Sequence, residues 1–219
     1  LRFWDKIAAH RPDKLVAISE TVRNRIKKYY DLESEVVYPP LMIRSIKYKV
    51  LSIKYKKQGY FLVVSRLVPY KRIDLAVKAA NKVGAPLKII GTGSEFAKLK
   101  SMAGPNVEFL GYVSDSDLKY YYSNCKALVF PGIEDFGLTM VEVNAFGKPV
   151  IAFRGGGAEE IIIEGKTGIF FDKLTVSSLA QKLKSFRPSR YNSLDCIKNS
   201  KRFSYEQFRR EILRLAETK

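Results

Sequence analysis

Two glutamates are the residues whose type and spacing point most directly to chemistry. Glu134 and Glu142 lie on either side of Gly137, which marks the expected start of a helix after a buried strand. The first amides of a helix have no partner inside it and carry the positive end of its dipole, so they favour an anion. Carboxylates beside an anion are repelled unless they accept hydrogen bonds from hydroxyl groups. The pair fits a ribose and a hexose flanking a diphosphate, whereas one glutamate alone is better explained by the helix dipole or a solvated surface.

Basic side chains follow another expected strand. Arg66 and Lys71 stand between the apolar run at 60–67 and the next helical pattern. Cations at the carboxyl end of a strand can hold a diphosphate through charge-assisted hydrogen bonds, although a solvated loop explains them equally well. Gly91 and Gly93 follow the next strand along the chain. They either let backbone amides approach a phosphate or serve the geometry of the turn alone.

The middle of the chain alternates short apolar runs with helical patterns. This alternation predicts an α/β fold, a Rossmann-like doubly wound parallel sheet that binds ligands at the carboxyl ends of its strands. Residues 1–41 repeat the pattern as a βαβ stretch with strands at 15–18 and 35–38, and 204–216 reads as an amphipathic helix. The other expected strands are 60–67, 87–90, 107–110, 127–130, 150–153 and 168–171, and the other expected helices are 20–30, 73–83, 94–102, 115–124, 138–146, 158–163 and 176–186.

The 219-residue chain is 46% hydrophobic and carries a formal net charge of +17. This composition excludes a largely disordered chain, and the charge predicts anionic partners such as phosphates, nucleic acid or a membrane surface. The excess charge is unevenly distributed. Residues 42–57 hold six basic and no acidic side chains, and residues 184–219 hold ten basic and four acidic ones. Residues 58–183, which carry the motifs above, are nearly balanced, with fifteen basic and twelve acidic side chains.

Other functional classes find little support in the residues. His10 is the only histidine, and Cys125 and Cys196 are the only cysteines, which argues against a zinc cluster, a disulfide framework or a triad that needs a second histidine. Asp115 and Asp117 match a D-x-D string, but their place at a helix start favours capping over metal binding. The sequence has no long apolar run and no signal peptide, so we expect a cytoplasmic protein. It begins with Leu rather than Met, which indicates a fragment.

Together these motifs resemble the C-terminal, donor-binding domain of glycosyltransferase family 4, a group of retaining transferases with the GT-B fold. The resemblance covers residues 58–186 and is strongest for mannosyltransferase-type members. It implies a remnant of the N-terminal acceptor domain at 1–41 and the nucleotide-sugar-binding domain at 58–190. Residues 42–57 match nothing in the family, and their own pattern predicts a basic linker or edge hairpin. The pattern also predicts a C-terminal amphipathic helix, to which we assign 191–219. The matching motifs are Ser65-Arg66-Leu67, Lys71-Arg72, Gly91-x-Gly93, Phe109–Val113, Phe130-Pro131, the E-x7-E pair Glu134 and Glu142, Gly155–Glu160 and Gly165–Gly168.

The resemblance gives each candidate residue a role. Arg66 and Lys71 would hold the diphosphate of a GDP- or UDP-linked sugar as it leaves. Glu142 would accept the ribose hydroxyls, and Glu134 would hydrogen-bond the sugar and orient its anomeric carbon. The catalytic candidates are therefore Glu134, Arg66 and Lys71. Further donor-binding positions are Phe136, Gly137, Leu138 and Thr139 at the helix start, Gly93, and Tyr112 and Val113 beside the base.

The expected function is the donor-binding part of a retaining transferase that moves a hexose, with mannose as one candidate, to a glycan or lipid-linked acceptor. The resemblance implies no metal and no cofactor besides the nucleotide sugar. Because most of the acceptor domain is missing, the isolated chain is expected to bind nucleotide but to need an upstream half or a partner subunit for catalysis. We interpret the basic segments 42–57 and 184–219 as a surface for an anionic membrane on its cytoplasmic face.

The alternative function is that of a basic nucleic-acid-binding α/β module without enzymatic activity, which the net charge of +17 motivates. Against it, no nucleic-acid-binding motif appears, and the excess charge lies outside the residues that carry the motifs. Nucleic acid is therefore not an expected partner.

Overall fold

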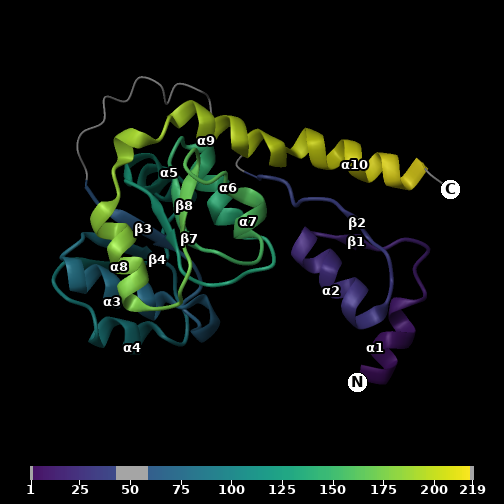
Figure 1. Ribbon diagram of the computed structural model, residues 1–219, viewed down its shortest axis with the longest axis horizontal. Coiled ribbons are helices and arrows are strands. Elements are labelled where there is room, and N and C mark those ends of the chain that lie inside the picture. The colour runs from purple at the N-terminus through teal and green to yellow at the C-terminus, as the bar shows by residue number, and fades with distance from the viewer. Residues whose placement is uncertain (1, 43–58, 218–219) are drawn as a thin grey trace.

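The computed structural model describes residues 2–42 and 59–217, so the expected linker or hairpin at 42–57 lies almost entirely outside the described residues. The main body is a parallel sheet of six strands in the order β5-β4-β3-β6-β7-β8 (Figure 1). This is the strand order of the doubly wound Rossmann fold, and it confirms the predicted fold class. The strands are β3 (Phe61–Val64), β4 (Leu87–Ile90), β5 (Val107–Gly111), β6 (Leu128–Phe130), β7 (Val150–Phe153) and β8 (Gly168–Phe171).

Helices cover both faces of this sheet, which is why its strands read as continuous apolar runs. Side chains alternate between the faces along each strand. Phe61 and Val63 face the first group of helices, whereas Leu62 faces the second. The first group comprises α3 (Ile73–Val83), α4 (Phe96–Ser101) and α8 (Val176–Ser185), and the second comprises α5 (Asp115–Asn124), α6 (Leu138–Ala145), α7 (Ala158–Ile161) and α9 (Ser193–Ser200).

The centre of the sheet is the place where the chain reverses its direction of winding. Strand β3 pairs with β4 on one side and with β6 on the other. The connections leave these strands towards opposite edges, so the loops at their carboxyl ends diverge and leave a crevice between them. The segments that follow β3 and β6 carry the predicted catalytic residues.

The N-terminal segment forms a small unit beside this body (Figure 1). Its strands β1 (Val16–Ala17) and β2 (Glu35–Val36) pair in parallel, and α2 (Glu20–Tyr30) connects them. The predicted βαβ stretch is therefore present, although both strands are shorter than expected. An additional helix, α1 (Arg2–Ala9), precedes it. None of the helices within the described ranges is long and apolar enough to cross a membrane.

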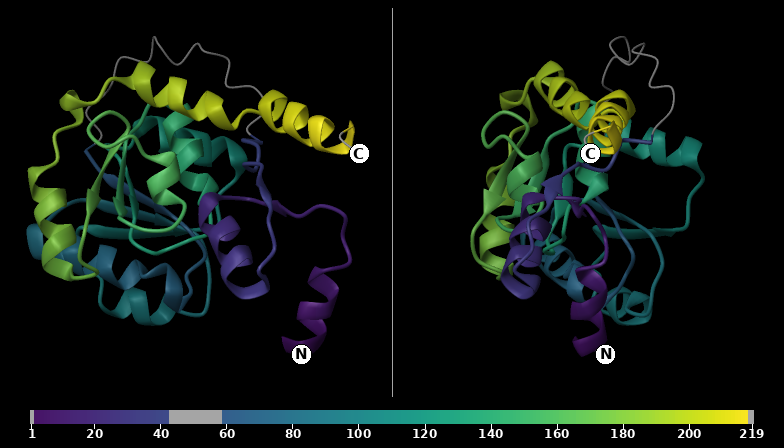
Figure 2. Two further views of the ribbon diagram at one scale, coloured as in Figure 1. Left: turned by 45° about the vertical axis from the view of Figure 1, so that its right-hand side comes forward. Right: turned by 90° about the vertical axis from the view of Figure 1, so that its right-hand side faces the viewer.

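The C-terminal part joins the two units. The predicted helix at 204–216 is α10 (Tyr205–Glu217), and it extends from the main body over the N-terminal segment (Figures 1 and 2). Lys14 Nζ donates to the Leu215 carbonyl at 2.8 Å, and Arg214 forms an ion pair with Glu35. The expected single helix at 191–219 is in fact two, because α9 precedes α10 and packs against α6.

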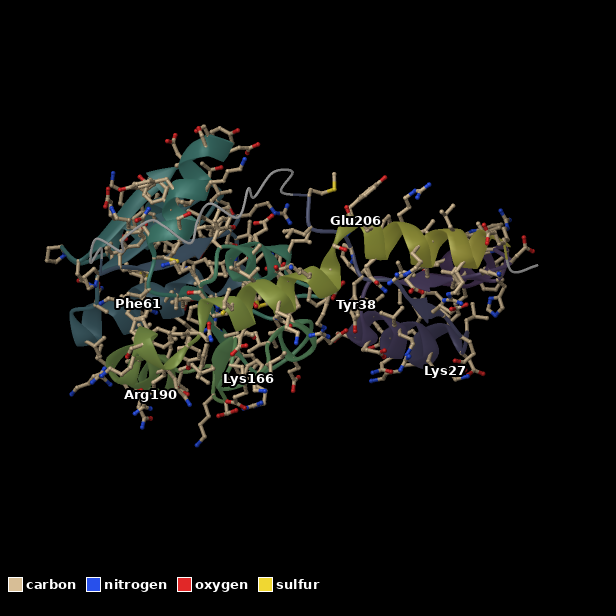
Figure 3. All side chains as sticks on the ribbon, turned by 90° about the horizontal axis from the view of Figure 1, so that it is seen from above. Lys27, Tyr38, Phe61, Lys166, Arg190 and Glu206 are labelled. Carbon is tan, nitrogen blue, oxygen red and sulfur yellow. The ribbon has the colours of Figure 1, made fainter. Side chains whose placement is uncertain are left out.

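A carboxylate of the main body also caps the N-terminal unit. Glu160 of α7 accepts hydrogen bonds from the amides of Glu20 and Thr21, at 2.8 and 3.1 Å. These are the first amides of α2, which have no partner inside their own helix. Nearby, Tyr38 lies where the N-terminal segment meets the main body (Figure 3), and its ring stacks on that of Phe136 at 5.6 Å.

Candidate functional site

A cleft of about 500 Å³ lies at the carboxyl ends of β3 and β6. The N-terminal segment contributes Ile18 and Pro39 to its wall, so the cleft lies between the two units of the chain. Its position matches the crevice expected at the point where the sheet reverses. Of the residues predicted for the site, the structure brings these together in the cleft: Arg66, Lys71, Glu134, Phe136, Gly137, Leu138 and Thr139.

An ion pair between two predicted catalytic residues lies in this cleft. The ammonium of Lys71 contacts the carboxylate of Glu134, and their side chains are only 12% and 23% exposed. A short 3-10 turn at Pro69–Lys71 brings the lysine to this place. Little water reaches the pair, so its charges interact more strongly than those of a surface pair. The site therefore holds a cation and a carboxylate that neutralise each other.

Within the described residues, the start of α6 has amide donors that no side chain caps. Gly137 precedes the helix at φ 99°, and no side chain caps it. This positive φ favours glycine, and a Cβ atom here would lie 2.5 Å from the Met140 Cε, so the methionine side chain would have to shift. Leu138 and Thr139, the first two residues of the helix, line the cleft. Their amides are among those that have no intrahelical acceptor, so the cleft offers two N–H groups and the positive helix end to an anion.

The remaining charges at the cleft are arranged around this centre. Arg66 is exposed, and its guanidinium donates to the Tyr70 hydroxyl at 3.0 Å. Asp135 forms an ion pair with Arg25, which comes from α2. The sequence prediction did not include Arg25, Ile18 or Pro39 in the site, because no motif in the N-terminal segment marks which of its residues reach the main body.

Phe136 lines the cleft although almost all of it is buried. The ring is 3% exposed and lies in an aromatic cluster with Tyr38 and Phe203, with a centroid distance of 5.3 Å to the latter. This cluster joins the N-terminal segment, the loop before α6 and the turn before α10. The position of the loop is thus fixed by packing on both units of the chain.

A glycine-rich turn after β7 packs against the loop 134–137, which lines the cleft. The amide of Gly157 donates to the Glu134 carbonyl at 2.9 Å. A Cβ atom at Gly157 would lie 2.2 Å from the Phe136 carbonyl oxygen, far inside van der Waals contact. The close approach of the two backbones therefore needs glycine at this position.

Replacing Gly157 with alanine is expected to displace the loop 134–137 and to lower the thermal midpoint of unfolding by several degrees. Gly59→Ala is the matched control, since the added methyl would meet only the flexible end of Lys126. Differential scanning fluorimetry of both variants checks this. Equal midpoints for the two variants would contradict the role of the close approach.

Gly91 and Gly93 serve the geometry of the neighbouring loop. Cβ atoms at these positions would lie 1.9 Å from the Ser65 carbonyl oxygen and 2.3 Å from that of Leu67. The Leu67 amide also donates to the Thr92 carbonyl at 2.9 Å. The two glycines therefore hold the segment that carries Arg66, and Gly93 itself does not line the cleft.

Three predicted residues lie farther along the same edge of the sheet. Tyr112 and Val113 follow β5, and Tyr112 is 86% exposed. Glu142 stands one turn into α6, where its Oε2 accepts a hydrogen bond from the hydroxyl of Tyr122 in α5, at 2.7 Å. Burial raises the pKa of the Glu142 carboxyl above its ordinary value. Glu142 thus lies apart from the Lys71–Glu134 pair and does not line the cleft.

The residues weighed against a metal site have structural partners. Ser114 caps α5 by accepting a hydrogen bond from the Asp117 amide, and its hydroxyl donates to the Asp117 carboxylate at 2.6 Å. Within residues 2–42 and 59–217, no three His, Cys, Asp or Glu side chains gather as metal ligands do. Cys125 and Cys196 are buried free thiols, and burial raises the pKa of each to about 12. His10 is exposed on the surface.

Comparisons with known proteins show which chains this one resembles. The chain is 29% identical over 189 residues to an uncharacterised glycosyltransferase of Methanocaldococcus jannaschii, covering 83% of this chain and 52% of that protein. It is 32% identical over 174 residues to the O-antigen chain mannosyltransferase RfbU of Salmonella typhimurium, covering 75% of this chain and 48% of that protein. The chain thus spans about half the length of the curated relatives it matches.

A solved structure and a family model extend these matches. The crystal structure of Anabaena Alr3699/HepE in complex with UDP and glucose superposes on this chain with a TM-score of 0.82 at 18% identity, covering 100% of this chain and 67% of that one. At this identity the likeness shows the fold alone, which is that of the GT-B glycosyltransferases. The model of the family described as glycosyl transferases group 1 matches residues 47–203. The chain therefore belongs to the glycosyl transferases group 1 family.

Proposed function

We propose that this chain is the donor-binding part of a retaining glycosyltransferase that takes a hexose from a GDP- or UDP-sugar. The observation that carries the proposal is the cleft itself, which joins the Lys71–Glu134 ion pair to the uncapped start of α6. A cation, two free amides and a carboxylate in one partly water-excluded place match the groups of a sugar diphosphate. The family supports the reaction class, and RfbU is a mannosyltransferase by name, which supports mannose as the sugar.

The diphosphate would bind to Lys71, Arg66 and the amides of Leu138 and Thr139. Its negative charge competes with Glu134 for the lysine, so binding would loosen the ion pair that closes the unliganded site. The released carboxylate of Glu134 would then accept a hydroxyl of the hexose and orient its anomeric carbon. In this scheme the contact between Lys71 and Glu134 is replaced by two contacts to the substrate, one from Lys71 to the diphosphate and one from Glu134 to a hydroxyl of the hexose.

In the chemical step, the residues that bind the diphosphate would stabilise it as the leaving group. The bond between the anomeric carbon and the diphosphate oxygen breaks, its electron pair goes to the diphosphate, and the sugar becomes oxocarbenium-like. Cations and amides held in place before the reaction stabilise the charge that develops on the oxygen. We propose that they do so without a metal ion, because the lysine, the arginine and the helix end already supply positive charge.

The nucleoside would lie along the sheet edge towards β5. Glu142 would accept the ribose hydroxyls, and the backbone at Tyr112 and Val113 would line the base, with Gly93 between them and the diphosphate. A GDP-sugar and a UDP-sugar are both candidates for the donor substrate. UDP is bound by the Anabaena protein, and that protein shares only the fold with this chain.

The acceptor would be a glycan or a lipid-linked sugar bound by parts beyond this chain, in the rest of a longer protein or in a partner subunit. We propose that such a part continues from the cleft wall formed by Ile18 and Pro39. We propose that catalysis needs this part, whereas nucleotide binding does not. We also propose that 58–190 is the nucleotide-sugar-binding domain, that 1–41 is the remnant of the acceptor domain, and that 42–57 and 191–219 are a linker and a C-terminal helical segment.

We also propose that the basic C-terminal part binds an anionic membrane on its cytoplasmic side. Residues 184–219 hold ten basic and four acidic side chains, and all six basic residues of 42–57 fall outside the described part. The chain is expected to sediment with vesicles that contain phosphatidylserine, but not with neutral ones, and to be released at high salt. Equal sedimentation with both kinds of vesicle would contradict this.

Calorimetry with GDP, UDP and a random DNA duplex tests the proposed function against the nucleic-acid-binding alternative. One of the two nucleotides is expected to bind, and Glu142→Ala is expected to weaken that binding by about 10- to 100-fold while any electrostatic binding to the duplex is unchanged. If neither nucleotide binds, or if the parent and Glu142→Ala bind equally, the assignment of the donor site is wrong.

A further inference from the structure

A fully buried tyrosine holds the carboxylate assigned to the ribose. Tyr122 has no exposed surface, and its ring stacks on that of Phe146 at 5.6 Å. Its hydroxyl donates to the Oε2 of Glu142 at 2.7 Å. A buried hydroxyl needs a hydrogen-bond partner, and here that partner is a carboxylate on the neighbouring helix. The contact therefore ties α5 to α6 at the proposed ribose position.

The contact with Tyr122 uses only one of the two carboxylate oxygens of Glu142. In the described part of the chain, no hydrogen bond occupies Oε1, while Oε2 is held by Tyr122. A glutamate has three rotatable bonds and loses conformational freedom when it binds a ligand. A carboxylate that is already fixed at one oxygen loses less when the other oxygen accepts hydroxyl groups.

The electrostatics of the pair act in the same direction. Burial, with a smaller contribution from the nearby charge of Asp115, raises the pKa of Glu142, whereas the hydrogen bond from Tyr122 lowers it. The tyrosine thus favours the ionised carboxylate, which accepts hydrogen bonds at both oxygens. Burial also raises the pKa of Tyr122 well above its ordinary value, so the hydroxyl stays protonated and remains a donor.

We infer that Tyr122 is a positioning residue that fixes Glu142 for ribose recognition, and that it thereby sets the preference of this site for ribonucleotides over deoxynucleotides. The inference rests on the proposed function, since Glu142 must meet the ribose. It adds a residue that contacts no substrate atom and acts through Glu142 alone. Its effect is specific to the sugar hydroxyls and leaves the diphosphate contacts at Lys71 intact.

Tyr122→Phe tests this inference, because it removes the hydroxyl and keeps the stacked ring. The readout is the ratio of dissociation constants for the 2′,3′-dideoxy and the ordinary nucleoside diphosphate, measured by calorimetry with whichever of UDP and GDP binds. The unmodified chain is expected to prefer the ribonucleotide by about 10- to 100-fold, which is the worth of charge-assisted hydrogen bonds to a carboxylate. In Tyr122→Phe the ratio is expected to fall to about 3 or less, with dideoxynucleotide affinity unchanged.

The pH dependence supplies a second readout. Loss of the hydrogen bond raises the pKa of Glu142 further, so protonation weakens ribonucleotide binding at a higher pH than in the unmodified chain. Tyr60→Phe is the matched control, because Tyr60 is also buried and its hydroxyl donates to the Tyr121 carbonyl of α5 at 3.1 Å. It is expected to leave both the ratio and the pH profile unchanged.

The outcomes separate this inference from the proposed function. If Glu142→Ala loses the preference and a folded Tyr122→Phe keeps it, the role of Tyr122 is wrong and the proposed function stands. If Glu142→Ala itself keeps the preference, the proposed ribose site is wrong. Should Tyr122→Phe fail to fold, a structure of the unmodified chain with nucleotide decides. A Tyr122–Glu142 hydrogen bond retained beside a ribose-bound Oε1 supports the inference, and its loss on binding overturns it.

Discussion

Replacing Lys71 with alanine is expected to weaken the binding of UDP or GDP by about 100-fold. Two effects add in this variant. The ammonium that would contact the diphosphate is lost from a place where it is only 12% exposed, and Glu134 is left in the cleft as an uncompensated negative charge. Isothermal titration calorimetry at constant ionic strength measures the change.

Lys78→Ala is the control for the loss of a positive charge. Lys78 lies on α3, about half exposed, and pairs with Asp74 at 3.9 Å. Its removal is expected to change the affinity by no more than about 2-fold, since exposed charges are screened. A double variant, Lys71→Ala with Glu134→Gln, is expected to recover part of the lost affinity, because the two side chains interact directly. Binding by Lys71→Ala within about 3-fold of the parent would contradict the placement of the diphosphate.

Glu134→Gln is expected to have the opposite effect on binding and a large effect on transfer. With the carboxylate gone, Lys71 is free for the diphosphate, so affinity for UDP or GDP should rise a few-fold. The sugar loses the carboxylate that orients its anomeric carbon, and the rate of hexose transfer should fall by about 100- to 1000-fold. The transfer rate is measured with the acceptor-binding part present, and binding by calorimetry on this chain.

The two variants together distinguish the proposed exchange of contacts from a merely structural ion pair. If the pair only held the loops together, both variants would lower the thermal midpoint and weaken binding to the same extent. Opposite changes in nucleotide affinity at similar thermal midpoints are the result that the exchange predicts.

The main sheet could be predicted from the sequence because its strands are buried on both faces. The runs at Val150–Phe153 and Gly168–Phe171 were predicted with the bounds that the structure shows. Each is short, continuously apolar and bounded by residues that favour turns, which leaves little freedom in where a strand begins and ends. The loops that follow parallel strands all lie at the same edge of the sheet. Because β3 and β6 are neighbours, the loops that carry Arg66, Lys71 and Glu134 lie side by side.

The side-chain contacts that define the site could not be predicted in this way. Three tyrosines in a row, Tyr120 to Tyr122, gave no sign that only the last would be buried and would meet Glu142. The ring of Phe136 packs in an aromatic cluster with Tyr38 and Phe203, and these two residues come from segments far apart in the sequence. Such contacts depend on how helices pack across elements, and the local pattern of one segment does not encode them.

The expected helix at 191–219 shows the same limit. The segment is divided into α9 and α10 by a turn at Lys201–Phe203. Cys196 and Asn199 of α9 are buried against the main body, and the side-chain amide of Asn199 donates to the Ile161 carbonyl at 2.8 Å. The short helix is thus stabilised by tertiary packing, which amphipathic periodicity over a few residues does not reveal.

A crystal structure of this chain with UDP or GDP at saturating concentration tests the central claim most directly. The account predicts that the diphosphate lies in the cleft within hydrogen-bonding distance of Lys71 Nζ and of the amides of Leu138 and Thr139, with the ribose beside Glu142. It also predicts that Glu134 no longer contacts Lys71. A nucleotide bound elsewhere, or a diphosphate that leaves the Lys71–Glu134 ion pair intact and the start of α6 unoccupied, would contradict the account.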